Sequence, residues 1–317
     1  MNKYLKETLK FLFGFILIIL AIFFVYRLHL HNIIKKNEEF AKYNTISYKQ
    51  NVNRIEYEFS KNPAEDIQEE TITDKKDKSK KYQIFYPLNK DKKLQPIFFS
   101  TDENLTYKDY EKSLQSLASF GFLVLVNEDS TNGNGENTYK AIETLASLNK
   151  DRSFSLKDKI DMNNIGLGGH GVGACEALNA SYLKNNDSIK AIFLTSLPKM
   201  GTINNKFLLK NKSSLAYDMK KVNKPIFITA GSGKIDSFYC PLEALSENIN
   251  SVNKNVEAYG AIKKKYDNNL VNNYHPLGYM NAWFNYSLKK DTTAANAFIV
   301  RNELKNNPSW AYVKDNR

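Results

Sequence analysis

Residues 164–178 read NIGLGGHGVGACEAL, and this stretch decides the fold. An apolar strand is predicted at Ile165–Leu167, and a Gly-rich turn follows it. A helix that begins with small apolar residues is predicted after the turn, at Val172–Lys184. A short buried strand that passes through a tight turn directly into a helix is typical of parallel sheets, where helices cover both faces. The stretch therefore predicts an α/β fold.

The same alternation continues on both sides of this stretch. Short apolar strands are predicted at Tyr82–Tyr86, Pro96–Ser100, Phe122–Val126, Ile189–Leu194, Pro225–Ala230 and Val256–Tyr259. Helices are predicted at Tyr107–Ser119, Tyr139–Leu148, Pro241–Ile249, Gly278–Leu288 and Thr293–Leu304. A first strand is expected at Asn53–Phe59, where apolar residues alternate, before a charged loop over residues 60–81. Together these elements predict a mostly parallel central sheet with helices on both faces, and the polar residues 199–221 are a natural place for a cap.

Composition and charge exclude several classes of protein. The 19 Phe, 19 Tyr and 2 Trp among 317 residues exclude a mostly disordered chain, and two cysteines exclude a disulfide scaffold. No Cys/His cluster predicts a metal, and the glycines of residues 166–173 lack the acidic ribose partner of a nucleotide fold, so we expect no cofactor. The net charge of +11 is spread along the chain, and its densest run, Lys75–Lys81, lacks aromatics. We therefore expect no nucleic-acid partner.

An uncharged segment near the start, residues 11–26 (FLFGFILIILAIFFVY), predicts a transmembrane signal anchor. The alternative is a cleaved signal peptide, but no small-x-small cleavage site follows. The lysines before the segment favour a cytoplasmic N-terminus over residues 1–10. After the segment, we expect a polar stalk over residues 27–50 and an α/β domain over residues 51–317. This arrangement predicts a single-pass protein of the cytoplasmic membrane with its C-terminal domain outside, at the cell surface or in the periplasm.

The glycine pattern carries a family resemblance. Gly169 and Gly173 match the outer glycines of Gly-x-Ser-x-Gly, so the stretch resembles the nucleophile elbow of the α/β-hydrolase superfamily. Three further stretches in the right order resemble bacterial lipase-like and dienelactone-hydrolase-like members: residues 82–128, 216–236 and 278–298. The resemblance covers about residues 82–305 and implies an α/β-hydrolase fold and the activity of a carboxylic ester hydrolase.

The resemblance also assigns the three roles of a catalytic triad. The nucleophile position is Gly171, which has neither the oxygen nor the sulfur that a base could activate. The acid position is Asp236, for which a loop residue that makes a turn or cap hydrogen bond is the alternative. The base is expected after the next strand, where this chain has Lys263 and two further lysines instead. His275 is the only candidate base there, and a surface histidine before a proline is the alternative.

The oxyanion hole of the family uses two backbone amides. Val172, directly after the nucleophile position, supplies the first, and Thr101, after the strand Pro96–Ser100, is the position of the second. The acidic residues Asp102 and Glu103 follow, and their charge would oppose catalysis unless they point away.

Three functions remain open from the sequence. The first is a catalytically silent α/β-hydrolase-like domain, or pseudoenzyme, that binds an unknown small molecule or an envelope partner near Gly171. The second is a working esterase or lipase-like enzyme with an unusual site, in which His275 and Asp236 activate water or a serine such as Ser100 or Ser232 is the nucleophile. The third is a purely structural envelope protein. Cys175, one helical turn beyond Gly171, is expected to be a small core residue.

Overall fold

The computed structural model describes residues 10–25, 27–28, 54–61, 66–89, 93–129, 133–200, 216–271 and 274–316. The chain consists of two compact units, residues 1–51 and 52–317. Most of the predicted cytoplasmic segment 1–10, most of the stalk 27–50 and most of the cap 199–221 lie outside the described residues.

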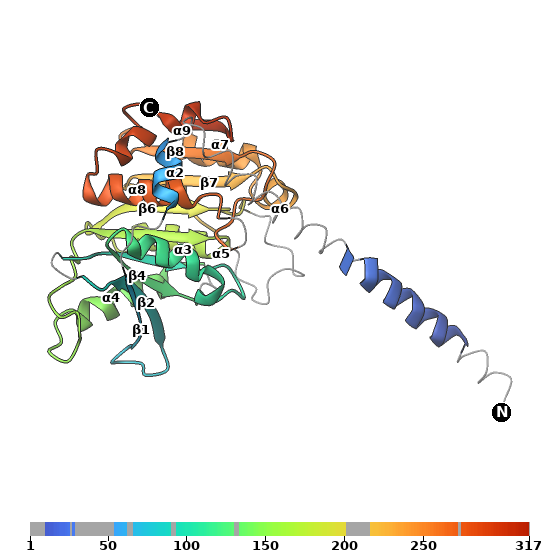
Figure 1. Cartoon of the computed structure of the whole chain (residues 1–317), viewed down its shortest axis with the longest axis horizontal. Coiled ribbons are helices and arrows are strands. Elements are labelled where there is room, and N and C mark those ends of the chain that lie inside the picture. Colours follow the sequence, from blue (N-terminus) through green and yellow to red (C-terminus); the bar gives the residue numbers. More distant parts are fainter. Residues whose placement is uncertain are drawn as a thin grey trace. The chain divides into compact units, whose positions relative to one another are not determined.

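In the first unit, residues 10–25 form a helix (Figure 1). Its apolar side chains are exposed, with Phe11 at 79% and Val25 at 64%. Across the described ranges, no helix combines the length and the apolar character needed to cross a membrane. The predicted anchor, residues 11–26, ends at a residue outside those ranges.

The second unit is built on a mixed, mostly parallel sheet, which confirms the α/β class. The strands that the structure describes are β1 (Ile67–Thr73), β2 (Lys81–Pro87), β3 (Gln95–Ser100), β4 (Phe122–Asn127), β5 (Ile165–His170), β6 (Ile189–Thr195), β7 (Ile226–Gly231), β8 (Ala258–Lys263) and β9 (Trp310–Asp315). Their order in the sheet is β1-β2-β4-β3-β5-β6-β7-β8-β9. The strands from β4 to β8 in this order run parallel, whereas β1–β2, β2–β4 and β8–β9 pair antiparallel.

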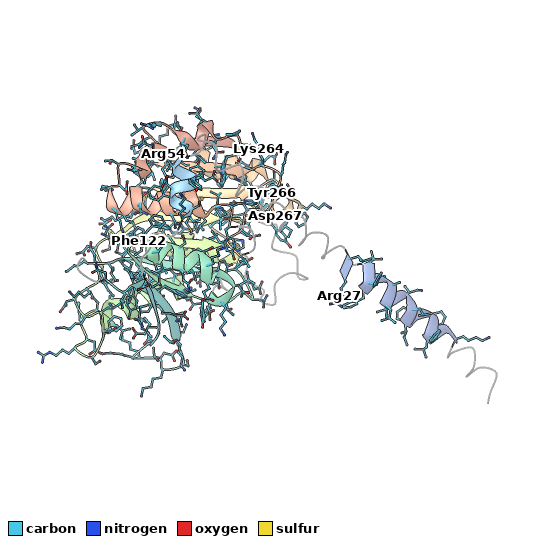
Figure 2. All side chains as sticks on the ribbon, viewed as in Figure 1. Arg27, Arg54, Phe122, Lys264, Tyr266 and Asp267 are labelled. Atoms are coloured by element: carbon cyan, nitrogen blue, oxygen red, sulfur yellow. The ribbon has the colours of Figure 1, made fainter. Side chains whose placement is uncertain are left out.

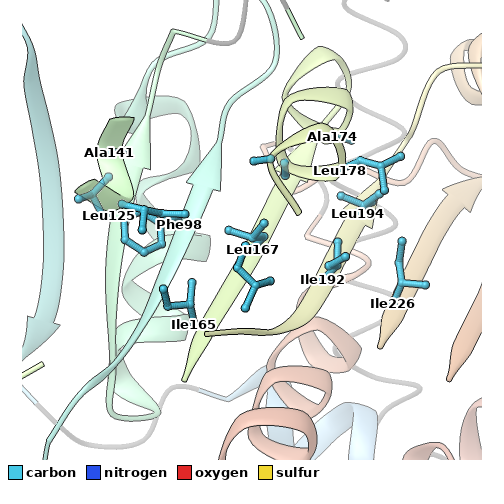
Figure 3. Packing of buried hydrophobic residues seen from close by; sticks show 14 of the residues in the cluster. Phe98, Leu125, Ala141, Ile165, Leu167, Ala174, Leu178, Ile192, Leu194 and Ile226 are labelled. Atoms are coloured by element: carbon cyan, nitrogen blue, oxygen red, sulfur yellow. The ribbon is translucent and has the colours of Figure 1, made fainter. Parts of the chain in front are cut away.

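Helices cover both faces of the sheet, as the alternation of elements predicts. One face carries α4 (Glu136–Leu148), α5 (Val172–Leu183) and α7 (Leu242–Ser251), and the other carries α2 (Arg54–Ser60), α3 (Tyr107–Ser119) and α8 (Leu277–Lys289). The shorter elements are η2 (Met219–Lys221), α6 (Lys234–Tyr239), η3 (Ala294–Ala297) and α9 (Glu303–Asn306). Figure 3 shows Leu167 and Ile192 of the sheet below Ala174 and Leu178 of α5, in the first of these cores.

Two of the predicted elements are wrong. Asn53–Phe59 is not a strand, because Ile55 and Phe59, four residues apart, bury one face of the helix α2 against α8. Thr293–Leu304 is not one helix but η3 and α9, separated by residues in other conformations, and Asn302 at φ 51° begins the second. The sequence also misses β1, inside the predicted charged loop, and the last strand, β9. The other strands and helices from Tyr82 to Leu288 are confirmed, with ends shifted by up to four residues.

Candidate functional site

The order of the strands reverses direction between the neighbouring strands β3 and β5. From β3 the chain passes through α3 to β4 on one side, and from β5 it passes through α5 to β6 on the other. In open α/β sheets the crevice at the carboxyl ends of two such strands is where ligands bind. Ser100 at the end of β3 pairs with Gly169 of β5, so the residues that follow, Thr101 with Asp102 and His170 with Gly171, meet at this edge of the sheet.

Gly171 forms the sharp turn that the glycine pattern predicts. Its φ of 57° and ψ of −122° lie where residues with a Cβ are strained. The turn is held at both ends, because Gly171 N–H donates to the Thr195 carbonyl (3.1 Å) and the Gly171 carbonyl accepts from Ala174 N–H (3.0 Å). At Gly173, an added Cβ would overlap the backbone of Ser100, so the helix α5 approaches β3 closely only because this residue is glycine.

The Asp102 carboxylate occupies the space beside Gly171. A Cβ built on Gly171 would overlap all three atoms of this carboxylate. Asp102 Oδ1 accepts hydrogen bonds from Val172 N–H (2.8 Å) and from Glu103 N–H (2.9 Å). A carboxylate at the N-terminus of α5 is stabilised by the helix dipole. The Val172 amide, which was expected to stabilise an oxyanion, is therefore hydrogen-bonded to the Asp102 carboxylate of the protein itself.

The backbone amide of Thr101, the second expected oxyanion donor, is also hydrogen-bonded within the protein. Its backbone N–H donates to the Asn127 carbonyl (3.1 Å), and its Oγ1 donates to the Leu105 carbonyl (3.0 Å). Its side chain is fully buried. The two amides that the sequence predicts for an oxyanion hole thus make bonds within the protein, one with a carboxylate and one with a neighbouring carbonyl.

A tyrosine and a histidine that the sequence did not link also lie at this edge of the sheet. The Tyr110 hydroxyl lies 2.7 Å from His170 Nδ1 and accepts a hydrogen bond from Asp102 N–H (3.1 Å). Burial raises the pKa of Tyr110 well above its usual value, so the phenol stays protonated and its proton is available to Nδ1. These bonds fix the position of the Asp102 backbone, and with it the position of the carboxylate.

Asp236, the expected triad acid, lies in the first turn of α6 and is buried. Its Oδ2 accepts from Gly231 N–H (2.6 Å) and Asn268 N–H (2.7 Å), and its Oδ1 accepts from the Cys240 thiol (3.2 Å). Within the described part of the chain it makes no hydrogen bond to His275. The carboxylate therefore joins the end of β7 to the loop after β8, as in the turn-and-cap alternative.

His275, the only candidate base, is buried and not on the surface, so the surface alternative is wrong. Its ring lies against Tyr266, with centroids 5.1 Å apart, and Figure 2 labels Tyr266 after β8. Burial lowers the pKa of His275, and the charge of Lys263 lowers it further, to about 3. The ring is therefore neutral and weakly basic at neutral pH.

This low pKa predicts a loss of stability in acid. The unfolded histidine binds a proton below about pH 6.5, whereas the folded ring stays neutral until about pH 3, so the free energy of unfolding falls as the pH drops between these values. At pH 5 we expect His275 to contribute a loss of about 2 kcal/mol relative to pH 7. Denaturant unfolding of the wild type and of His275→Gln at both pH values measures it. An equal change in both proteins would contradict the assignment.

The other proposed nucleophiles lie in different surroundings. Ser100 Oγ shares a hydrogen bond with Thr138 Oγ1 (2.8 Å), both buried, and Ser232 Oγ accepts from Lys265 N–H (2.7 Å). Cys175 is fully buried, as expected of a core residue, and burial raises the pKa of its thiol. In the described residues, the side chain of none of the three forms a hydrogen bond with Gly171.

Lys263 stands where the resemblance leads us to expect a histidine. Its ammonium is buried at the end of β8 and pairs with Glu56 of α2, with Nζ and Oε1 3.4 Å apart. Trp310 Nε1 (2.9 Å) and Asn307 Nδ2 (2.6 Å) also donate to the Glu56 carboxylate. The lysine therefore replaces a possible base with a buried ion pair that docks α2 on the domain.

Comparison with known proteins does not assign the chain. No family model matches it, and no curated protein matches it significantly. Among the residues that the structure describes, no group of three His, Cys, Asp or Glu side chains is arranged to hold a metal ion.

Proposed function

We propose that this protein is a catalytically silent member of the α/β-hydrolase superfamily that binds a small molecule or a partner near Gly171 in place of hydrolysing an ester. The observation that carries the proposal is the Asp102 carboxylate at Gly171, bonded to Val172 N–H. The turn from β5 into α5, with its positive φ, supports the elbow resemblance. The place of the Gly171 turn, at the carboxyl ends of β3 and β5 where the order of the strands reverses, supports a binding role.

The missing groups explain why we expect no turnover. Loss of a triad nucleophile alone costs on the order of 10⁶ in kcat. Here Gly171 has no nucleophilic atom, and the expected oxyanion amide already holds a negative charge. A developing oxyanion would have to displace Asp102 and would meet its repulsion, so two requirements of acyl transfer are lost together.

The apolar residues 11–26 support an anchor in the cytoplasmic membrane, with the α/β domain outside. In this proposal the partner is an unidentified small molecule or another component of the cell envelope.

A fluorophosphonate probe tests the central statement. The full chain, in neutral detergent, is treated with excess probe and examined by intact mass, with an active serine esterase in the same sample as a positive control. We expect complete labelling of the esterase and no adduct on this protein, because a fluorophosphonate reacts with an activated hydroxyl. A stoichiometric adduct, mapped to one residue, would overturn the proposal and establish a hydrolase.

A further inference from the structure

A groove lies toward the opposite ends of the parallel strands from the Gly171 turn. It is lined by α2, by Phe120 at the end of α3 and by residues 291–301, and its volume is about 530 Å³. Phe120 lies two residues before β4, whereas Gly171 follows the parallel strand β5. The groove therefore lies toward the amino ends of the parallel strands, and the Gly171 turn lies at their carboxyl ends. Its volume is in the range of small-molecule sites.

The groove has an apolar floor. Ile55 and Phe59 project from α2 and are buried, and Phe120 is half-buried beside them. The rings of Phe59 and Phe120 are stacked, with centroids 5.3 Å apart and planes at 20°. Such a floor offers apolar contact to a ring or an alkyl chain without requiring hydrogen bonds from it.

Two arginines stand at the rim. Arg54 begins α2, where Figure 2 labels it, and Arg301 follows η3, and both are exposed. Neither guanidinium forms an ion pair or a hydrogen bond with another residue in the described part of the chain. The lining also holds the carboxylate of Asp291, whose Oδ1 accepts hydrogen bonds from Thr293 N–H (2.7 Å) and Ala294 N–H (3.0 Å). Glu58 is the remaining carboxylate of the lining.

We infer that this groove binds an anionic amphiphile: a phosphate or carboxylate group held by Arg54 and Arg301, with an attached ring or alkyl chain on Phe59 and Phe120. Guanidinium groups form paired, charge-assisted hydrogen bonds with such anions. Because both arginines are exposed, we expect the affinity for the anion to be only moderate, and we expect added salt to lower it. The inference does not depend on the function proposed for the region of Gly171.

Phenyl phosphate is a suitable probe, because it combines a phosphate with one ring and does not form micelles. Isothermal titration of the full chain in neutral detergent should show saturable binding, and inorganic phosphate should bind at least about threefold more weakly because it lacks the ring. Arg54→Gln and Arg301→Gln should each weaken phenyl phosphate binding about three- to tenfold. Raising the salt concentration should weaken binding to the wild type as well.

Two variants separate this site from a general electrostatic effect. Lys305→Gln removes an exposed positive charge outside the groove and should leave the affinity unchanged. Glu58→Gln removes a negative charge from the lining and should tighten binding about two- to threefold, which a merely structural role would not produce. Absence of saturable binding, or equal losses in Lys305→Gln and the two arginine variants, would overturn the inference. Equal affinity for inorganic phosphate would overturn the role of the apolar floor.

Discussion

Replacing Gly171 with serine should destabilise the protein by about 2–4 kcal/mol and still yield no fluorophosphonate adduct. The new Cβ would be strained at φ 57° and would overlap the Asp102 carboxylate. Asp102 cannot move without cost, because Val172 N–H would lose its acceptor. Denaturant unfolding measures the loss of stability, and intact mass after probe treatment measures the adduct.

Gly171→Ala is the matched control for this variant, because it adds the same Cβ without the hydroxyl and should lose a similar amount of stability. Combining Gly171→Ser with Asp102→Gly should relieve the overlap and recover part of the loss. An adduct on the Gly171→Ser single variant would contradict the structure, since it would require the serine hydroxyl and a free oxyanion site where Asp102 lies. An adduct on the double variant alone would show that Asp102 is what closes the site.

The fold around the Gly-rich turn could be predicted because its cause is local. Buried strands such as Phe122–Asn127 are runs of apolar residues, and glycine at 171 and 173 meets a backbone requirement that no other residue satisfies as well. The outer elements could not be predicted so well. The apolar residues of Arg54–Ser60 fit a strand and a helix, and only packing on α8 decides for the helix. Strand β9 depends on pairing with β8, which local sequence does not show.

The sequence predicts where the residues of the candidate site lie better than it predicts which contacts they make. The sequence places Asp102 near the expected oxyanion, but the direction of the carboxylate depends on Tyr110 and Val172. The contact between Tyr110 and His170 joins residues 60 positions apart, and no spacing rule connects them. Asp236 follows β7 in the first turn of α6. One of its partners, Asn268, comes from the loop after β8, which the sequence left without structure.

The second large effect concerns the buried pair of Glu56 and Lys263. Glu56→Gln should lower the free energy of unfolding by about 3–5 kcal/mol, because the Lys263 ammonium stays buried without its counter-charge. The carboxylate also accepts from Trp310 and Asn307, so the change weakens the contacts that hold α2 on the C-terminal part of the domain. Denaturant unfolding at pH 7 measures the loss.

The double variant Glu56→Gln with Lys263→Met separates the effect of an uncompensated charge from the effect of changing the side chains. Lys263→Met alone leaves the Glu56 carboxylate with its two neutral donors and should cost less than Glu56→Gln. Together, the two changes remove both charges and should recover stability relative to Glu56→Gln alone, because a buried pair replaced as a whole costs little. At the exposed pair of Lys184 and Glu143, where the atoms are 2.9 Å apart, Glu143→Gln should cost below about 1 kcal/mol. Equal losses at the two pairs would contradict the argument, since the pairs differ chiefly in burial, and burial is what makes an uncompensated charge expensive.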